Sequence, residues 1–231
     1  METERDEEAA TGERSEGIRS GGQGTQIRDC QFRPQSQSRE LVKRVGTILR
    51  GYTPRPDLSM QLVPILQFNY WTMKASHMML LKAANKDHDQ LTLSAYFRNH
   101  AREEKHHDRW MMKDLRESGY FEGECPLIAA SLIGTVMYSI EFIDPCALLG
   151  WQIIGECFPL TEDQLQGLEL VWGKTLLRTI RYHATHDRAH ALDLLAQIDL
   201  LAPRRFAIVE RTALATARMF AAAMAEIAHA G

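Results

Sequence analysis

The sequence predicts an all-α protein in which seven helices form a single bundle. Two observations lead to this prediction. Apolar residues recur at intervals of three and four along most of the chain after residue 38, which is the spacing of one helix face. Runs of alternating Val, Ile and Thr bounded by Asn-Gly turns, the usual sign of strands, are absent from the sequence. A length of 231 residues suits one domain with a sizeable core.

Residues 1–38 are expected to form a disordered N-terminal tail ahead of a helical domain over residues 39–231. The tail is rich in Glu, Gly, Ser, Gln and Arg and has too few large apolar residues to offset chain entropy. It carries eight acids and five arginines, so it accounts for the net charge of −3 and leaves the domain close to neutral. A neutral domain argues against a nucleic-acid binder held by phosphate contacts.

The first three helices have recognisable ends. Ser38 is a suitable N-cap for the first helix, and Gly51 with Pro54 closes it. The second helix carries an apolar stripe that begins at Leu62, and the third is closed by Gly119. These helices are expected over residues 39–50, 59–85 and 91–118.

The remaining four helices follow from apolar runs and breakers. The apolar segment 127–142 is expected to be a buried helix that ends at Asp144-Pro145, and a second apolar helix follows over 147–156. Thr161 opens the sixth helix, which is expected to run unbroken to about Ile198. After Pro203 an Ala-rich amphipathic helix occupies 205–230.

Two segments share the spacing His-x3-acid-x2-His. On a helix, positions i, i+4 and i+7 leave from one face within an arc of roughly 60°. Six of the nine histidines lie in these two segments, a clustering that the composition does not explain. Two such stripes facing each other in a bundle would offer four imidazoles and two carboxylates, the ligand set of a non-haem iron site. Since i and i+7 are about 10.5 Å apart along the axis, two ions suit the stripes better than one. The stripes are His100, Glu104 and His107, and His183, Asp187 and His190.

A third acid is expected from another helix, and Glu156 is preferred over Glu141. It ends an apolar segment in which an unpaired carboxylate would be costly, and Gly150 and Gly155 would let a neighbouring helix approach closely. An exposed helix-end carboxylate is the alternative for this residue. Two alternatives for the ligands remain. In a shifted register, the residues next to the first stripe would face the metal, and the second helix would supply one additional ligand. The residues concerned are Glu103 with His106, and His77.

These residues resemble those of a known family. The stretches HAREEKHHDRWMMKDLRESG (100–119), DPCALLGWQIIGE (144–156) and HATHDRAH (183–190) are similar to the haem-oxygenase-like di-iron oxidases and oxygenases, whose fold is that of thiaminase II and PqqC. The resemblance covers roughly residues 40–225. It implies a seven-helix bundle in which two iron ions activate O₂ for the oxidation of an amine, amino acid or fatty acid. It also implies seven metal ligands, namely His100, Glu104, His107, Glu156, His183, Asp187 and His190.

Two other functions remain as alternatives at this point. A thiaminase-II-like hydrolase without a cofactor would require Cys125, Cys146 or Cys157 to face the cavity as a nucleophile. A non-catalytic iron-binding protein would use the same ligands without an organic substrate. Haem oxygenase itself would need a histidine on the first helix, and the earliest one here is His77.

The expected partners are a small-molecule substrate and O₂, with an external reductant and a homodimer left open. An apolar pocket is expected, and Arg178 and Arg181 are candidates to bind a substrate carboxylate. No apolar run is long enough to span a membrane, and the cysteines show no C-x-x-C spacing, so a reduced cytoplasmic protein is expected. The residues expected to line the pocket are Tyr70, Trp71, Met73, Met137, Tyr138 and Trp151.

Overall fold

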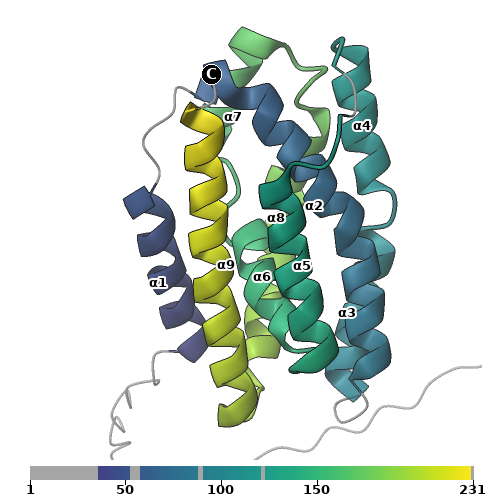
Figure 1. The fold of residues 1–231 in the computed structure, drawn as a ribbon, viewed down its shortest axis with the longest axis vertical. Coiled ribbons are helices and arrows are strands. Elements are labelled where there is room, and N and C mark those ends of the chain that lie inside the picture. Colours follow the sequence, from purple (N-terminus) through teal and green to yellow (C-terminus); the bar gives the residue numbers. More distant parts are fainter. Residues whose placement is uncertain (1–35, 53–57, 88–90, 121–122, 230–231) are drawn as a thin grey trace, which may run out of the picture. The chain divides into compact units, whose positions relative to one another are not determined.

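A computed structural model describes residues 36–52, 58–87, 91–120 and 123–229. Over these residues the chain forms nine α-helices and no strand, which confirms the predicted all-α class (Figure 1). Most of the predicted disordered tail lies outside the described residues, and the first helix begins at Gln37, slightly earlier than expected. The helices are α1 (Gln37–Tyr52), α2 (Leu58–Lys86), α3 (Leu91–Glu103), α4 (His107–Glu117), α5 (Leu127–Phe142), α6 (Ala147–Glu156), α7 (Glu162–Trp172), α8 (Arg178–Asp199) and α9 (Pro203–His229).

The count differs from seven because two predicted helices are divided. The predicted helix 91–118 breaks into α3 and α4 at His106, whose φ of 79° lies in the left-handed region. The predicted helix 161–198 breaks into α7 and α8 at Gly173, whose φ is 80° and whose N–H donates to the carbonyl of Glu169 at 2.9 Å. A glycine adopts this conformation without steric cost, whereas a histidine does so only under strain.

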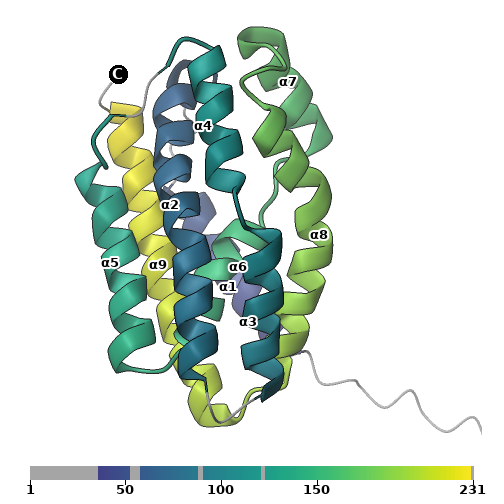
Figure 2. The same cartoon turned by 90° about the vertical axis from the view of Figure 1, so that its right-hand side faces the viewer.

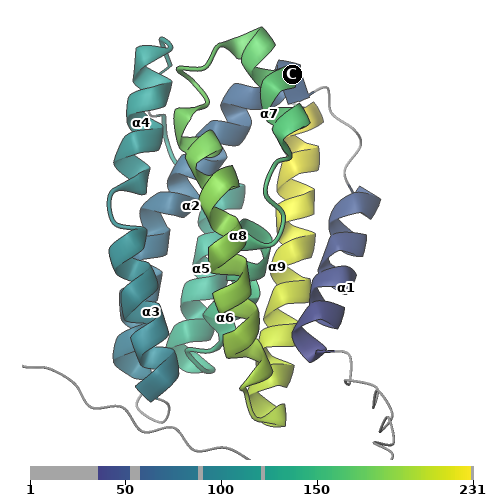
Figure 3. The same ribbon diagram turned by 180° about the vertical axis from the view of Figure 1, so that it is seen from behind.

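Helix α6 is the most enclosed of the described helices. It packs on α9, α8 and α5, and the longer helices surround it (Figures 2 and 3). A Cβ at Gly150 would lie 2.7 Å from both the Val209 carbonyl oxygen and the Ala213 nitrogen, so only glycine permits this approach of α9. A Cβ at Gly155 would meet nothing within 4 Å, so the expected close helix approach is confirmed at Gly150 and wrong at Gly155.

Helix α5 is not the buried helix that its apolar sequence predicts. One face, which includes Leu132 and Val136, lies in the core, but Leu127 is 83% exposed and Phe142 is 70% exposed. Helix α5 lies at the periphery of the bundle (Figure 2), whereas α6 is enclosed. Both segments are mainly apolar, so their composition alone did not distinguish the two positions. Among the described helices, none combines the length and the apolar character that crossing a membrane requires.

A buried aspartate fixes α4 against α8. The Asp114 carboxylate accepts hydrogen bonds from the backbone N–H of Thr179 at 2.8 Å, from the Thr179 hydroxyl at 2.7 Å and from Nε of Arg178 at 2.9 Å. Thr179 lies in the first turn of α8, so Asp114 satisfies a backbone donor that has no partner within the helix. This contact sets the register in which His107 of α4 meets His183 of α8.

Candidate metal centre

The seven predicted ligands lie in one cluster, which we call the inner cluster. They come from α3, α4, α6, α8 and the short link between α3 and α4. Within it, two groups of three side chains each bring their ligand atoms within 4.8 Å of one another. The first group is His100, Glu156 and His190, and the second is Glu104, His107 and His183.

The first group is built around the Glu156 carboxylate. Nε2 of His100 lies 3.3 Å from one carboxylate oxygen, and Nδ1 of His190 lies 3.4 Å from the other. The two imidazole rings are 4.9 Å apart and meet edge to face. His100 is only 3% exposed, so the group lies inside the bundle.

The second group joins the link between α3 and α4 to α8. Oε2 of Glu104 lies 3.2 Å from Nδ1 of His107, and the rings of His107 and His183 are 4.8 Å apart. Trp110 and Tyr182 contact the His107 ring from the outer side, with ring centroids 4.4 and 5.5 Å away. Glu104 and His107 are both buried.

The break at His106 produces this grouping. On a continuous helix His100, Glu104 and His107 would form one stripe, as the spacing predicts. The left-handed residue instead lets Glu104 and His107 meet His183, while His100 meets Glu156 and His190. Strained backbone of this kind costs on the order of 1–3 kcal/mol and is concentrated at functional sites.

Asp187 lies outside both groups but near each of them. Its Oδ1 is 3.2 Å from Nδ1 of His183, which leaves Nε2 of His183 to face the second group. Burial raises the pKa of Asp187, and the negative charge of Glu156 raises it further. The Asp187 carboxylate therefore orients one histidine and is close to the carboxylate of the other group.

The three residues considered as alternative ligands lie at the edge of the inner cluster or outside it. Glu103 is 57% exposed in its side chain, and its Oε2 lies 3.6 Å from Nε2 of His190 and 3.9 Å from Nδ1 of His100. His77 bonds through Nδ1 to the Ala101 carbonyl at 2.8 Å and belongs to neither group. His106 is exposed at the helix break.

The imidazoles supply positive charge for the buried acids. Burial opposes ionisation of Glu156, but His100 and His190 outweigh it and lower the pKa of Glu156 to about 2. Glu156 in turn raises the pKa of His190 to about 9. Burial is outweighed at Glu104 as well, where His107 and His183 lower the pKa. Protons thus occupy the role that metal ions would take, and metal binding would displace them.

Two ligand atoms of the inner cluster, Oε1 of Glu104 and Nε2 of His183, are buried and have neither a hydrogen-bond partner nor an ion-pair partner. Oε2 of Glu156 and Nδ1 of His190 face each other at 3.4 Å as an ion pair. A buried polar atom without a partner is costly, and a bound cation would remove that cost at Glu104 and His183. Each group also consists of two histidines and one carboxylate, the donor set of non-haem Fe(II) oxygenases. The residues present therefore fit two iron ions.

A cavity of about 400 Å³ opens beside the inner cluster. His100, Glu104, Glu156, His183 and Asp187 line one side of it. The remaining wall is mainly apolar and comes largely from α2, α6 and α9. Of the residues predicted to line a pocket, Met73 and Trp151 do so, whereas Tyr138 is 60% exposed on the outer face of α5. Gln152, which no sequence pattern indicated, is buried and also lines the cavity.

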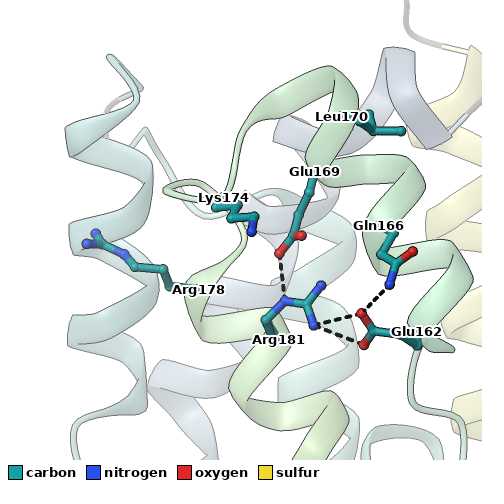
Figure 4. Close-up of a pocket in the computed structure, with 7 residues that line it drawn as sticks. All are labelled: Glu162, Gln166, Glu169, Leu170, Lys174, Arg178 and Arg181. Atoms are coloured by element: carbon teal, nitrogen blue, oxygen red, sulfur yellow. Dashed lines mark hydrogen bonds and ion pairs between the residues drawn. The ribbon is translucent and has the colours of Figure 1, made fainter.

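Arg178 and Arg181 do not reach this cavity. Arg181 bonds to Glu169 at 2.6 Å and to Glu162 at 2.9 Å, and Gln166 bonds to Glu162 from the same side (Figure 4). We call Glu162, Gln166, Glu169 and Arg181 the α7–α8 cluster. Arg178 points away from it and pairs with Asp114 and Glu117. The expectation that these arginines bind a substrate carboxylate is therefore not supported.

Comparison with solved structures identifies the fold. A domain of unknown function with a haem oxygenase-like fold from Shewanella denitrificans OS217 superposes with a TM-score of 0.70. The match covers 82% of this chain and 90% of that one, at 12% sequence identity. The sequence matches no protein-family model, and a search of curated proteins gave no significant match. The chain thus has a haem-oxygenase-like fold, with two groups of side chains in its interior that could each hold a metal ion.

Proposed function

We propose that the protein is an O₂-dependent non-haem di-iron oxidase or oxygenase that acts on a small organic molecule. The observation that carries the proposal is the pair of two-histidine, one-carboxylate groups at the wall of a single cavity. Three protein ligands leave coordination positions open at each ion, as O₂ chemistry requires. The resemblance of the sequence to di-iron oxidases and oxygenases supports the same function.

In this proposal the first iron is held by His100, His190 and Glu156, and the second by His107, His183 and Glu104. Two ferrous ions would supply the electrons that activate O₂. The protein residues orient the ligands and enclose the site. Asp187 holds the His183 ring through Nδ1, and the apolar wall keeps water away from the reacting groups.

The hydrolase alternative receives no support from the cysteines. None of the three described cysteines lines the cavity, and burial raises the pKa of Cys125 and of Cys157, the latter to about 12. A nucleophilic cysteine requires a lowered pKa, because the thiolate is the reactive form. A non-catalytic iron-binding protein would use the same ligands, and the cavity beside them argues for an organic substrate instead.

Oxygen uptake by the iron-loaded protein tests the proposal. The chain is loaded with Fe(II) without air and then mixed with O₂ and ascorbate, alone and with members of a panel of amines, amino acids and fatty acids. We expect at least one compound to sustain O₂ consumption over many turnovers and to be oxidised. The proposal is wrong if the protein binds no iron, or if no compound is oxidised and none raises O₂ uptake above that of the iron-loaded protein with ascorbate alone.

A matched pair of variants separates the histidines of the centre from a histidine at the surface. His183→Ala removes a ligand of the second group, and His186→Ala removes the exposed histidine three residues later on the same helix. We expect His183→Ala to abolish sustained uptake and His186→Ala to retain it. Equal activity of the two variants would contradict the assignment of His183.

A further inference from the structure

Two aromatic side chains at the protein surface contact the imidazoles of the second group. Trp110 of α4 is 42% exposed and Tyr182 of α8 is 38% exposed, and the centroids of their rings are 5.2 Å apart. The centroid of the His107 ring lies 4.4 Å from that of Trp110. The Tyr182 centroid lies 5.5 Å from that of His107 and 6.0 Å from that of His183. A short array of contacting rings therefore joins the solvent to the second group.

The surface that carries Trp110 is rich in cations. Residues 98–117 contain six Lys and Arg side chains, all of them exposed, whereas only two of the five acids in this range are exposed. Of these cations, Lys113 alone has an acid within ion-pair distance among the described residues, namely Glu117. The surface of α3 and α4 is therefore locally positive. The six cations are Arg98, Arg102, Lys105, Arg109, Lys113 and Arg116.

These features define the kind of partner that fits the surface. Exposed Trp and Tyr beside Arg are the residue types that most often carry the binding energy of protein interfaces. Two copies of this chain meeting through the same surface would bring like charges together, which opposes self-association. A net charge of −3 for the whole chain makes nucleic acid a poorer match. An acidic protein complements the surface, because its charge would be attracted to the unpaired cations.

The position of the aromatic rings indicates what an acidic partner would do there. A one-electron cofactor placed against Trp110 and Tyr182 would be separated from the second group only by these rings. Electron transfer slows steeply with distance, so this short path favours delivery of electrons at this surface. The approach to the first group differs, because Glu103 is 57% exposed beside His190 and would repel an acidic protein.

We propose that the surface around Trp110 and Tyr182 docks an acidic one-electron carrier protein of the ferredoxin type, and that the two rings lead its electrons to the second group. In each encounter the reduced carrier loses one electron and one ferric ion becomes ferrous, so two encounters restore both ferrous ions. The proposal deepens the proposed function by naming its reductant. It rests on that function for electron transfer but not for docking, which is measurable on the metal-free protein.

Calorimetric titration of the metal-free full-length chain tests the docking. The probe is oxidised plant-type [2Fe–2S] ferredoxin, a small acidic one-electron carrier. We expect binding at low ionic strength that weakens about tenfold or more between about 20 and 200 mM NaCl, because salt screens the attraction between the charged surfaces. Absence of binding would overturn the proposal. Equal or tighter binding of a single-stranded oligonucleotide would also overturn it.

A charge-reversal variant tests the location of docking. Arg109 and Lys113 lie one residue before Trp110 and three residues after it on α4. We expect Arg109→Glu combined with Lys113→Glu to weaken ferredoxin binding about tenfold or more. The matched control combines Arg211→Glu with Arg218→Glu at two exposed arginines of α9, which lies away from α4 in Figures 1 and 3, and it retains more of the affinity. Equal effects of the two double variants would overturn the assigned surface.

Removal of the two rings tests the path of the electrons. The ferric protein is mixed without air with saturating reduced ferredoxin, and oxidation of the ferredoxin is followed by its absorbance. We expect Trp110→Leu combined with Tyr182→Leu to slow this first-order step about tenfold or more at unchanged iron content. Equal rates in this variant and its control would overturn the path. The control combines Tyr138→Leu with Phe142→Leu, an exposed pair of contacting rings on α5.

The two proposals fail in distinguishable ways. A chain that binds ferredoxin but no iron contradicts the proposed function and leaves the docking surface in place. A chain that binds iron and oxidises a compound with ascorbate, but binds no ferredoxin, contradicts the docking surface and leaves the proposed function in place.

Discussion

Two clusters of acids and bases in this protein differ in how their acids are neutralised. In the α7–α8 cluster, at the surface, Glu162 and Glu169 each bond to the guanidinium of Arg181 (Figure 4). In the inner cluster Glu104 and Asp187 are buried and the Glu156 side chain is only 12% exposed. The only bases there are imidazoles, and Oε1 of Glu104 and Nε2 of His183 have no partner. A group of charged residues is thus not by itself a sign of a metal site. Burial combined with unsatisfied ligand atoms is the informative observation.

The two clusters differ in their basic residue, which is arginine in the α7–α8 cluster and histidine in the inner cluster. Arginine keeps its proton under all ordinary conditions, so it neutralises an acid permanently and blocks a metal ion. Histidine gives up its proton at accessible pH and then becomes a ligand itself. The inner cluster can therefore exchange protons for metal ions, whereas the α7–α8 cluster cannot.

The largest expected effect is the loss of one iron ion from the inner cluster. Glu156→Gln removes the only carboxylate of the first group and preserves the size of the side chain. We expect iron affinity at this position to fall by more than about 100-fold, since even changes outside the ligands cost 10–100-fold. Iron analysis after gel filtration should give one ion per chain instead of two. Glu162→Gln in the α7–α8 cluster is the control and should retain both.

Asp114 is a buried acid whose carboxylate is hydrogen-bonded within the protein, so it serves as a comparison for the acids of the inner cluster. Asp114 is as buried as the metal ligands but accepts three hydrogen bonds. We expect Asp114→Asn to lower the free energy of unfolding by about 1–3 kcal/mol, because the amide group presents donors to Arg178 where an acceptor was. Denaturant titration measures this change. At saturating Fe(II) the variant should still bind two ions, and a loss of iron without a loss of stability would contradict a purely structural role.

A smaller effect is expected in the α7–α8 cluster. Arg181→Met removes the cation that pairs with Glu162 and Glu169. Glu162 is 54% exposed and Arg181 is 33% exposed, so water and salt screen their ion pair, although Glu169 is largely covered. The variant should therefore lower Tm less than Asp114→Asn does. The difference from wild type should shrink further in 1 M NaCl, as thermal unfolding would show. A large effect that salt does not reduce would mean that this cluster resembles the inner one.

The smallest effect concerns a partly exposed acid that is paired with lysines. Glu141 lies 2.7 Å from Nζ of Lys82 and 2.9 Å from Nζ of Lys86, and these bonds lower its pKa from 4.5 to about 2. The lowered pKa stabilises the fold above pH 4.5, and this contribution disappears as the pH falls toward 2. The difference in Tm between wild type and Glu141→Gln should therefore shrink over that range. A constant difference would contradict it.

The sequence predicted the helices well where breakers are explicit. It located α5 and α6 to the residue, and it placed Glu156 in an enclosed position from the apolar segment before it. The division between α7 and α8 was not predicted, although Gly173 is a residue type that often ends a helix. The helical periodicity on both sides of Gly173 favoured one continuous helix instead. The break at His106 carried no such signal, since histidine is not a residue that marks a position in the left-handed region.

That break limited what the sequence could say about the centre. The periodicity indicated the histidines and acids but assigned His100, Glu104 and His107 to one stripe. The structure instead divides them between two groups, each completed by residues of α8. Gln152 was not predicted either, because a glutamine within an apolar helix has no distinctive pattern until the cavity beside it is known.

The central claim is that the inner cluster holds two iron ions, one in each group. Anomalous diffraction at the iron absorption edge, from crystals grown without air in excess Fe(II), tests it directly. We expect two peaks in each chain, one among His100, Glu156 and His190 and one among Glu104, His107 and His183. A single peak, or peaks only at the protein surface, would contradict the account.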